Sequence, residues 1–123
     1  MRTKELLIIA VVHAGSFVVA AAVIRLLHVG DPGLALVMGA VGGSNAAAMQ
    51  YHRRMPERAP FAVKASAGAV LAVMAVLMGL ASQLLLKWMT YPDVVIPISF
   101  VGSFVFPFVL FGTLRRAYAG RRS

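Results

Sequence analysis

The sequence predicts an all-α membrane protein, a bundle of four transmembrane helices that forms a single domain over residues 1–123 with both termini in the cytoplasm. Hydrophobic residues make up 60% of the chain and charged residues only 13%, whereas a soluble domain is about half apolar and a quarter charged. The apolar residues form four runs, each near the roughly 20 residues that a helix needs to cross about 30 Å of hydrocarbon. The basic residues lie between these runs. Lipid is therefore expected to surround most of the chain.

The first helix is predicted over residues 5–27. A basic start precedes an apolar stretch of 19 residues from Leu6 to Ile24, which is longer than the apolar core of a signal peptide. We therefore expect a membrane span here rather than a cleaved leader.

The other helices are predicted over residues 33–51, 63–86 and 94–118. "HVGDPG" reads as a turn, and Pro32 suits the first turn of the second helix. "KWMTYPD" reads as a second turn, with Trp88 and Tyr91 as interfacial anchors. The runs do not alternate in polarity as barrel strands would, so helices are the way to pair the backbone in lipid.

Orientation follows from the distribution of lysine and arginine. Ten of these residues fall in the N-terminus, the middle connection and the C-terminal tail, and only Arg25 and Lys87 fall elsewhere. Because cytoplasmic segments carry the excess of basic residues, the bias predicts that both ends face the cytoplasm.

Several functional classes lack support in the sequence. Cysteine is absent, and the four acids (Glu5, Asp31, Glu57 and Asp93) fall at predicted helix ends or in connections. No Walker loop, dinucleotide fingerprint or H-E-x-x-H motif is present. We therefore expect no enzyme, no catalytic residue, no metal site and no cofactor. The net charge of +8 is explained by topology, so no nucleic-acid partner is expected.

His13 is the ionisable residue well inside the first run. A titratable group at that depth is a functional hypothesis by default, and with Asn45 it forms a candidate intramembrane polar site. The alternative is a neutral histidine that bonds a serine, an amide or a carbonyl of a neighbouring helix. His28 is 15 residues further on, more than about 20 Å along one helix, so the two histidines cannot share a ligand.

The second run contains small residues in the stretch "GAVGGSNAAAMQ". Small residues let helix backbones approach closely, and an amide can bond across the gap. We expect helix packing within the bundle, or contact with a partner, at Gly39, Gly42, Gly43, Ser44 and Asn45.

The basic residues at the cytoplasmic ends are expected to attract anionic lipid head groups. Next to them, His52 is expected to be solvated. In the fourth run Pro97 and Pro107 predict a kink, and its phenylalanines, including Phe111, suit a surface that faces lipid or a pigment. The residues assigned to lipid contact are Arg53, Arg54, Arg58, Arg115 and Arg116.

Two resemblances bear on these expectations. "GSNAAAMQ", "RRMPERAP" and "FGTLRRAYAGRR" together resemble a group of small uncharacterised four-helix proteins of the bacterial inner membrane, which implies a fold and a multi-pass location in that membrane. "MGAVGGSNAAAMQYHRR" is similar in type to the glycine-rich second helix and basic loop of subunit I of bacterial ATP synthase, which assists assembly of the rotor ring. That family usually carries an acid near the start of its third helix, where this chain reads "FAVKASAG".

Two functions fit these features. The first is an accessory or assembly subunit that binds laterally to a larger membrane complex, with membrane lipids and other membrane subunits, or a second copy of itself, as partners. The alternative is a small oligomeric transporter or channel with His13 and Asn45 near its path.

Overall fold

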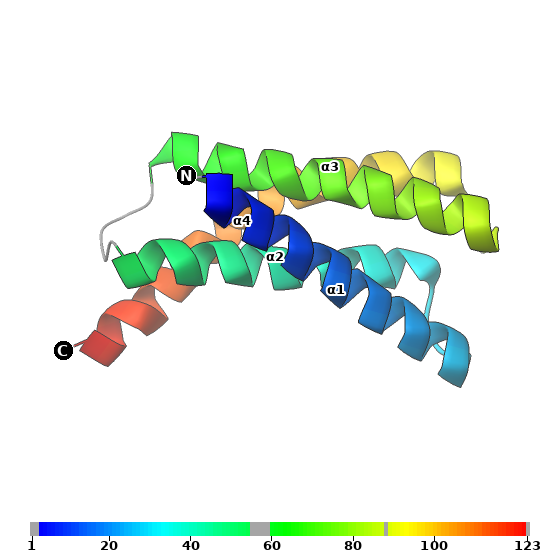
Figure 1. The fold of residues 1–123 in the computed structure, drawn as a ribbon, viewed down its shortest axis with the longest axis horizontal. Helices are drawn as coiled ribbons and strands as arrows, with labels where there is room; N and C mark the ends of the chain where they lie inside the picture. Colours follow the sequence, from blue (N-terminus) through cyan, green and yellow to red (C-terminus); the bar gives the residue numbers. More distant parts are fainter. Residues whose placement is uncertain (1–2, 55–59, 88, 123) are drawn as a thin grey trace.

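The computed structural model is all-helical in the part of the chain that it describes, residues 3–54, 60–87 and 89–122; the side chains of Pro32 and of residues 53–54 and 112–122 are not described. The elements in chain order are α1 (Thr3–Leu27), α2 (Pro32–Arg54), α3 (Phe61–Leu86) and α4 (Pro92–Arg122) (Figure 1). The predicted Trp88 anchor and the centre of the middle connection, residues 55–59, lie outside the described residues.

The helices extend beyond the apolar runs that predict them. Both α2 and α4 begin at a proline, Pro32 and Pro92, because a missing N–H and a fixed φ suit the first helical position. The same helices continue to Arg54 and Arg122, past the last apolar residue, because backbone hydrogen bonding does not require an apolar side chain. α4 also continues as an α-helix through Pro97 and Pro107.

Two tight turns join the helices into hairpins. At the first, Asp31 accepts a hydrogen bond from the Gly33 N–H at 2.8 Å, and Gly30 adopts a φ of 83° that a residue with a side chain rarely adopts. At the second, the Lys87 N–H donates to the Gln83 carbonyl oxygen, and the Met89 N–H donates to Gln83 Oε1 at 2.9 Å. Gln83 therefore caps the end of α3 with both backbone and side chain.

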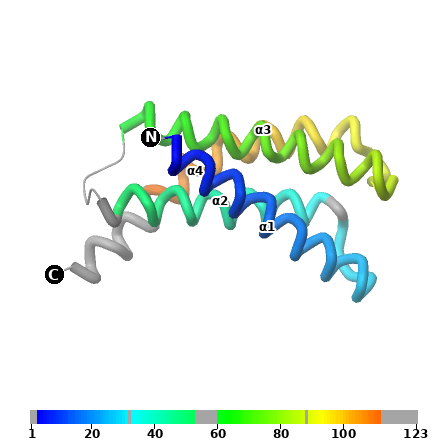
Figure 2. The backbone as a smooth tube through the Cα atoms, viewed as in Figure 1, coloured from blue at the N-terminus to red at the C-terminus, as the bar shows by residue number. Residues whose placement is uncertain are grey.

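The four helices form a diamond in cross-section. Contacts join α2 and α3 to each other and to both remaining helices, and α1 and α4 each pack on this central pair. The tube drawing shows α1 diverging from α2 toward the turn that connects them (Figure 2).

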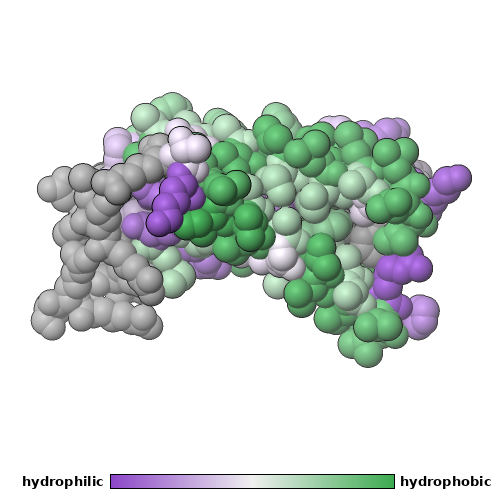
Figure 3. All heavy atoms as spheres, viewed as in Figure 1, coloured by the Kyte–Doolittle hydropathy of each residue, from purple (hydrophilic) through white to green (hydrophobic). Residues whose placement is uncertain are grey.

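Three of the helices are long and apolar enough to cross a membrane: α1, α3 and α4 from Pro92 to Phe111. This agrees with the prediction of a membrane protein. α2 is not among them, because glycine, Ser44, Asn45 and Gln50 lower its hydropathy. Hydrophobic residues cover much of the visible surface, and hydrophilic ones gather toward its ends (Figure 3).

Buried apolar side chains form two clusters. One cluster joins Ile9, Leu71 and Phe111 with alanines of α2 and α3. The other joins Phe17, Leu36 and Ile96 near the opposite end of the bundle. About two turns of α1 therefore separate Ile9 from Phe17, and His13 lies midway between them.

The backbones of α3 and α4 lie close together at Gly68. A Cβ built on Gly68 would collide with the Phe104 carbonyl oxygen, a backbone atom that cannot rotate away. We predict that Gly68→Leu lowers the free energy of unfolding by about 1–3 kcal/mol, the range for an overpacked core. Denaturant titration in detergent micelles measures the change.

Gly15→Leu is the matched control, since no heavy atom lies within 4 Å of a Cβ at Gly15. Equal midpoints for the two variants would contradict the close approach of α3 and α4.

Candidate functional site

His13 lies in a notch that two glycines of α2 form, and we call Gly39 and Gly43 the glycine notch. The side chain is fully buried. A Cβ built on Gly39 would lie 2.9 Å from His13 Cε1 and 3.0 Å from Nε2, and one built on Gly43 would lie 3.4 Å from His13 Cβ. The imidazole therefore occupies the space that a side chain at Gly39 would fill, and the G-x-x-x-G pair packs against α1 of the same chain.

Two further side chains complete this contact. Ser16, one turn after His13, packs against Gly42, and a Cβ at that position would collide with its Oγ. Leu71 of α3 packs against Gly43 from another side. Gly39, Gly42 and Gly43 thus receive side chains from two different helices. Ser16 shares a helix face with His13 and was detectable from its spacing, whereas no sequence signal indicates Leu71.

The buried polar groups around this contact lack hydrogen-bond partners within the described structure. Neither His13 Nδ1 nor His13 Nε2 has one, and neither does Ser44 Oγ, which is fully buried. A buried polar group without a partner costs about 1–3 kcal/mol. His13 is thus held by the fit of its ring into the notch and not by a hydrogen bond to any described residue.

Asn45, the second residue of the predicted polar site, is not brought to His13. Its Nδ2 donates to the Val41 carbonyl oxygen of its own helix at 2.9 Å. Asn45 follows Gly43 by two residues, about 200° around the helix at 3.6 residues per turn, so it faces away from the notch.

His52 is not solvated, contrary to the expectation from its arginine neighbour. It is 2% exposed, and its ring centroid lies 5.3 Å from that of Tyr51 and 5.8 Å from that of Phe111. Phe111 is likewise buried rather than facing lipid. His52 stays in the bundle against α4 because α2 remains helical beyond its apolar run.

The arginines predicted to contact anionic lipid head groups have side chains outside the described part of the chain. They are Arg53, Arg54, Arg58, Arg115 and Arg116. Among the described residues, no group of three or more histidine, cysteine or acidic side chains could hold a metal ion.

No protein-family model, curated protein sequence or solved structure matches the chain. Its function is therefore inferred from its own residues and geometry.

The contact between His13 and Gly39 can be measured as a coupling energy. We predict that Gly39→Ala destabilises the protein because its new Cβ meets the imidazole, and that the same substitution costs less in a His13→Ala background. Neighbouring residues typically couple by about 0.5–3 kcal/mol. A double-mutant cycle on unfolding in micelles gives this value.

Gly15→Ala serves as the control partner for His13→Ala, because its Cβ enters open space. Additive effects for Gly39→Ala and His13→Ala would show that the ring does not occupy the notch.

Proposed function

We propose that this chain is a multi-pass protein of the bacterial inner membrane, with four transmembrane helices and both termini in the cytoplasm, that serves as an accessory or assembly subunit of a larger membrane complex. The observation that carries the proposal is an exposed apolar face of α4 with an unfilled hollow at Gly102. That face offers a lateral docking surface within the membrane.

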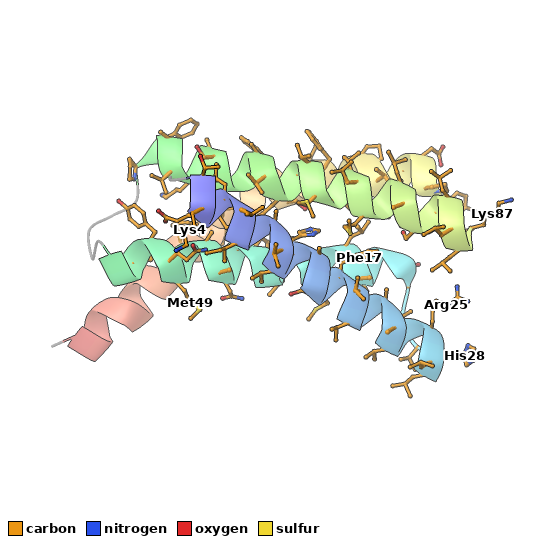
Figure 4. The ribbon with its side chains drawn as sticks, viewed as in Figure 1. Lys4, Phe17, Arg25, His28, Met49 and Lys87 are labelled. Carbon is orange, nitrogen blue, oxygen red and sulfur yellow. The ribbon has the colours of Figure 1, made fainter. Side chains whose placement is uncertain are left out.

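The directions of the helices support four spans. Arg25, His28 and Lys87 lie at one end of the bundle and Lys4 at the other (Figure 4), so α1 and α3 run in the same direction. The chain must therefore return between them. α2 has 23 residues, about 34 Å at 1.5 Å per residue, which suffices for a hydrocarbon core of about 30 Å.

The lower hydropathy of α2 fits a span inside the bundle. Its small residues receive His13, Ser16 and Leu71, so helices rather than lipid cover that face. In membranes, close packing and dispersion replace the hydrophobic effect as the force between helices, and small residues make that packing tight.

The docking surface is the outward side of α4, and we call it the α4 face. Val94, Ile98, Val101, Val105 and Val109 are each about half to two-thirds exposed on it. Gly102 has no heavy atom within 4 Å of a built Cβ, and two shallow hollows of about 180 and 460 Å³ both include Ile98 and Gly102. A ridge of side chains on a partner helix can enter such a hollow.

A transporter remains the alternative because His13 is buried and its nitrogens have no hydrogen-bond partner among the described residues. Transport also needs a polar route past the midplane. The notch around His13 is filled by packing, and Asn45 bonds its own helix. The described geometry therefore favours the accessory function.

The topology can be tested on a chain that has no native cysteine. We predict that His28→Cys and Tyr91→Cys react with a membrane-impermeant maleimide in spheroplasts, and that Pro60→Cys reacts only in inside-out vesicles. The physical reason is that the two tight turns lie on one side and the start of α3 on the other. Labelling of all three from the same side would rule out α2 as a span.

The docking surface can be tested by filling its hollow. We predict that Gly102→Leu reduces several-fold the partner subunits that co-purify from native membranes in mild detergent, because the new side chain occupies the space of the partner ridge. Quantitative mass spectrometry measures the partner-to-chain ratio. Gly15→Leu, which also enters open space, should keep the wild-type ratio.

Recovery of the wild-type chain alone, as a defined oligomer, would contradict the accessory function and favour the transporter. Transport assays on a His13→Ala, Asn45→Ala variant would then be the next step.

A further inference from the structure

A groove of about 790 Å³ lies between α1 and α2 on the surface of the bundle. Its floor consists of small residues, Gly15, Ser16, Ala20 and Gly42, and Val19, Val23, Leu34 and Met38 are among its walls. The volume is that of a small-molecule site. Apart from Ser16 every lining residue is apolar or glycine, so the occupant must be apolar.

The groove exists because the two helices cross and then separate. Ser16 packs on Gly42 at the crossing, which closes the groove at that end. Toward the connecting turn α1 diverges from α2 (Figure 2), and Val29 and Gly30 of the turn line the far end. The groove is thus closed at one end, open along its side and bounded by a turn at the other.

Its length matches one leaflet. The α1 part of the lining runs from Gly15 to Ile24, about 14 Å at 1.5 Å per residue, and half of a hydrocarbon core of about 30 Å is about 15 Å. The closed end lies near the middle of α1, whose bounds are Thr3–Leu27. A partner's transmembrane helix would run the full thickness, whereas an acyl chain of one leaflet ends at the midplane.

Polar side chains lie beside the turn end of the groove, where they suit a lipid head group. Arg25 and His28 lie at that end of α1 (Figure 4), and both are exposed, as is Asp31. These side chains mark the depth at which the hydrocarbon ends. An acyl chain that enters the groove from the turn end places the lipid head group beside the turn and its terminal methyl group at Ser16.

We propose that this groove holds one acyl chain of a phospholipid from the leaflet that contains the turn between α1 and α2. The site is separate from the α4 face, and it depends on the membrane-crossing orientation of α1 and α2 but not on any partner. Bound lipid would fill the space between the diverging helices and support the open half of the hairpin.

The test uses the purified full-length chain in nanodiscs that contain phosphatidylglycerol with a photoactivatable diazirine in the middle of one acyl chain. We expect adducts, mapped by mass spectrometry, to concentrate on groove residues such as Val19 and Met38. We expect several-fold fewer adducts per residue at Val101 and Val105 of the α4 face, which are equally exposed.

Gly15→Leu should reduce groove adducts several-fold because its side chain projects into the groove, where a Cβ meets no heavy atom within 4 Å. Gly102→Leu, the matched glycine on α4, should leave them unchanged. Met38→Phe fills the groove from the opposite wall and replaces Gly15→Leu if that variant does not fold.

Three results would overturn the assignment. The first is labelling of the groove no stronger than that of the α4 face, and the second is groove labelling that Gly15→Leu does not alter. The third is a groove that the lipid probe does not label in a protein whose native mass is that of a dimer, because a second copy would then be the occupant. None of these results bears on whether Gly102→Leu releases a partner, so the lipid site and the docking surface fail independently.

Discussion

The close approach of α1 to α2 at three glycines is the constraint on which the rest of the bundle depends. Gly39 leaves room for the imidazole of His13, and Gly42 leaves room for Ser16. A Cβ built on Gly43 would be in ordinary van der Waals contact with His13 Cβ. Small residues are the means by which membrane helices gain tight packing, and here they also tolerate a buried histidine whose nitrogens have no partner among the described residues. The apolar clusters at either end of the bundle begin one turn away from this contact, at Ile9 and Phe17.

The two surfaces with functional proposals follow from the same packing. α1 and α2 cross where they are held together and separate beyond the crossing. The space between the separating helices is the groove on one side of the hairpin. Because α2 and α3 occupy the centre, one side of α4 packs inward and the other stays open around Gly102. One face thus suits a single acyl chain, and the other suits a neighbouring helix.

Much of the fold could be predicted from composition and run length, because the requirement to satisfy the backbone in lipid leaves helices of a set length as the solution. Side-chain partners were harder to predict. The glycines indicated close packing, but nothing in the sequence pairs Gly43 with Leu71. His52 was expected to follow its charged neighbour into water, whereas the helix continues and packs it against Phe111. Asn45 has the polarity of a site residue but faces away from the notch.

The most direct test of the central contact is a solid-state NMR spectrum of the protein in liposomes, with labelled histidine and glycine. His13, His28 and His52 are assigned by single substitutions. We predict cross-peaks between the ring carbons of His13 and the Cα of Gly39, since a Cβ at that glycine would lie 2.9 Å from His13 Cε1. A His13 ring with no glycine contact, and with contacts to water instead, would contradict this prediction.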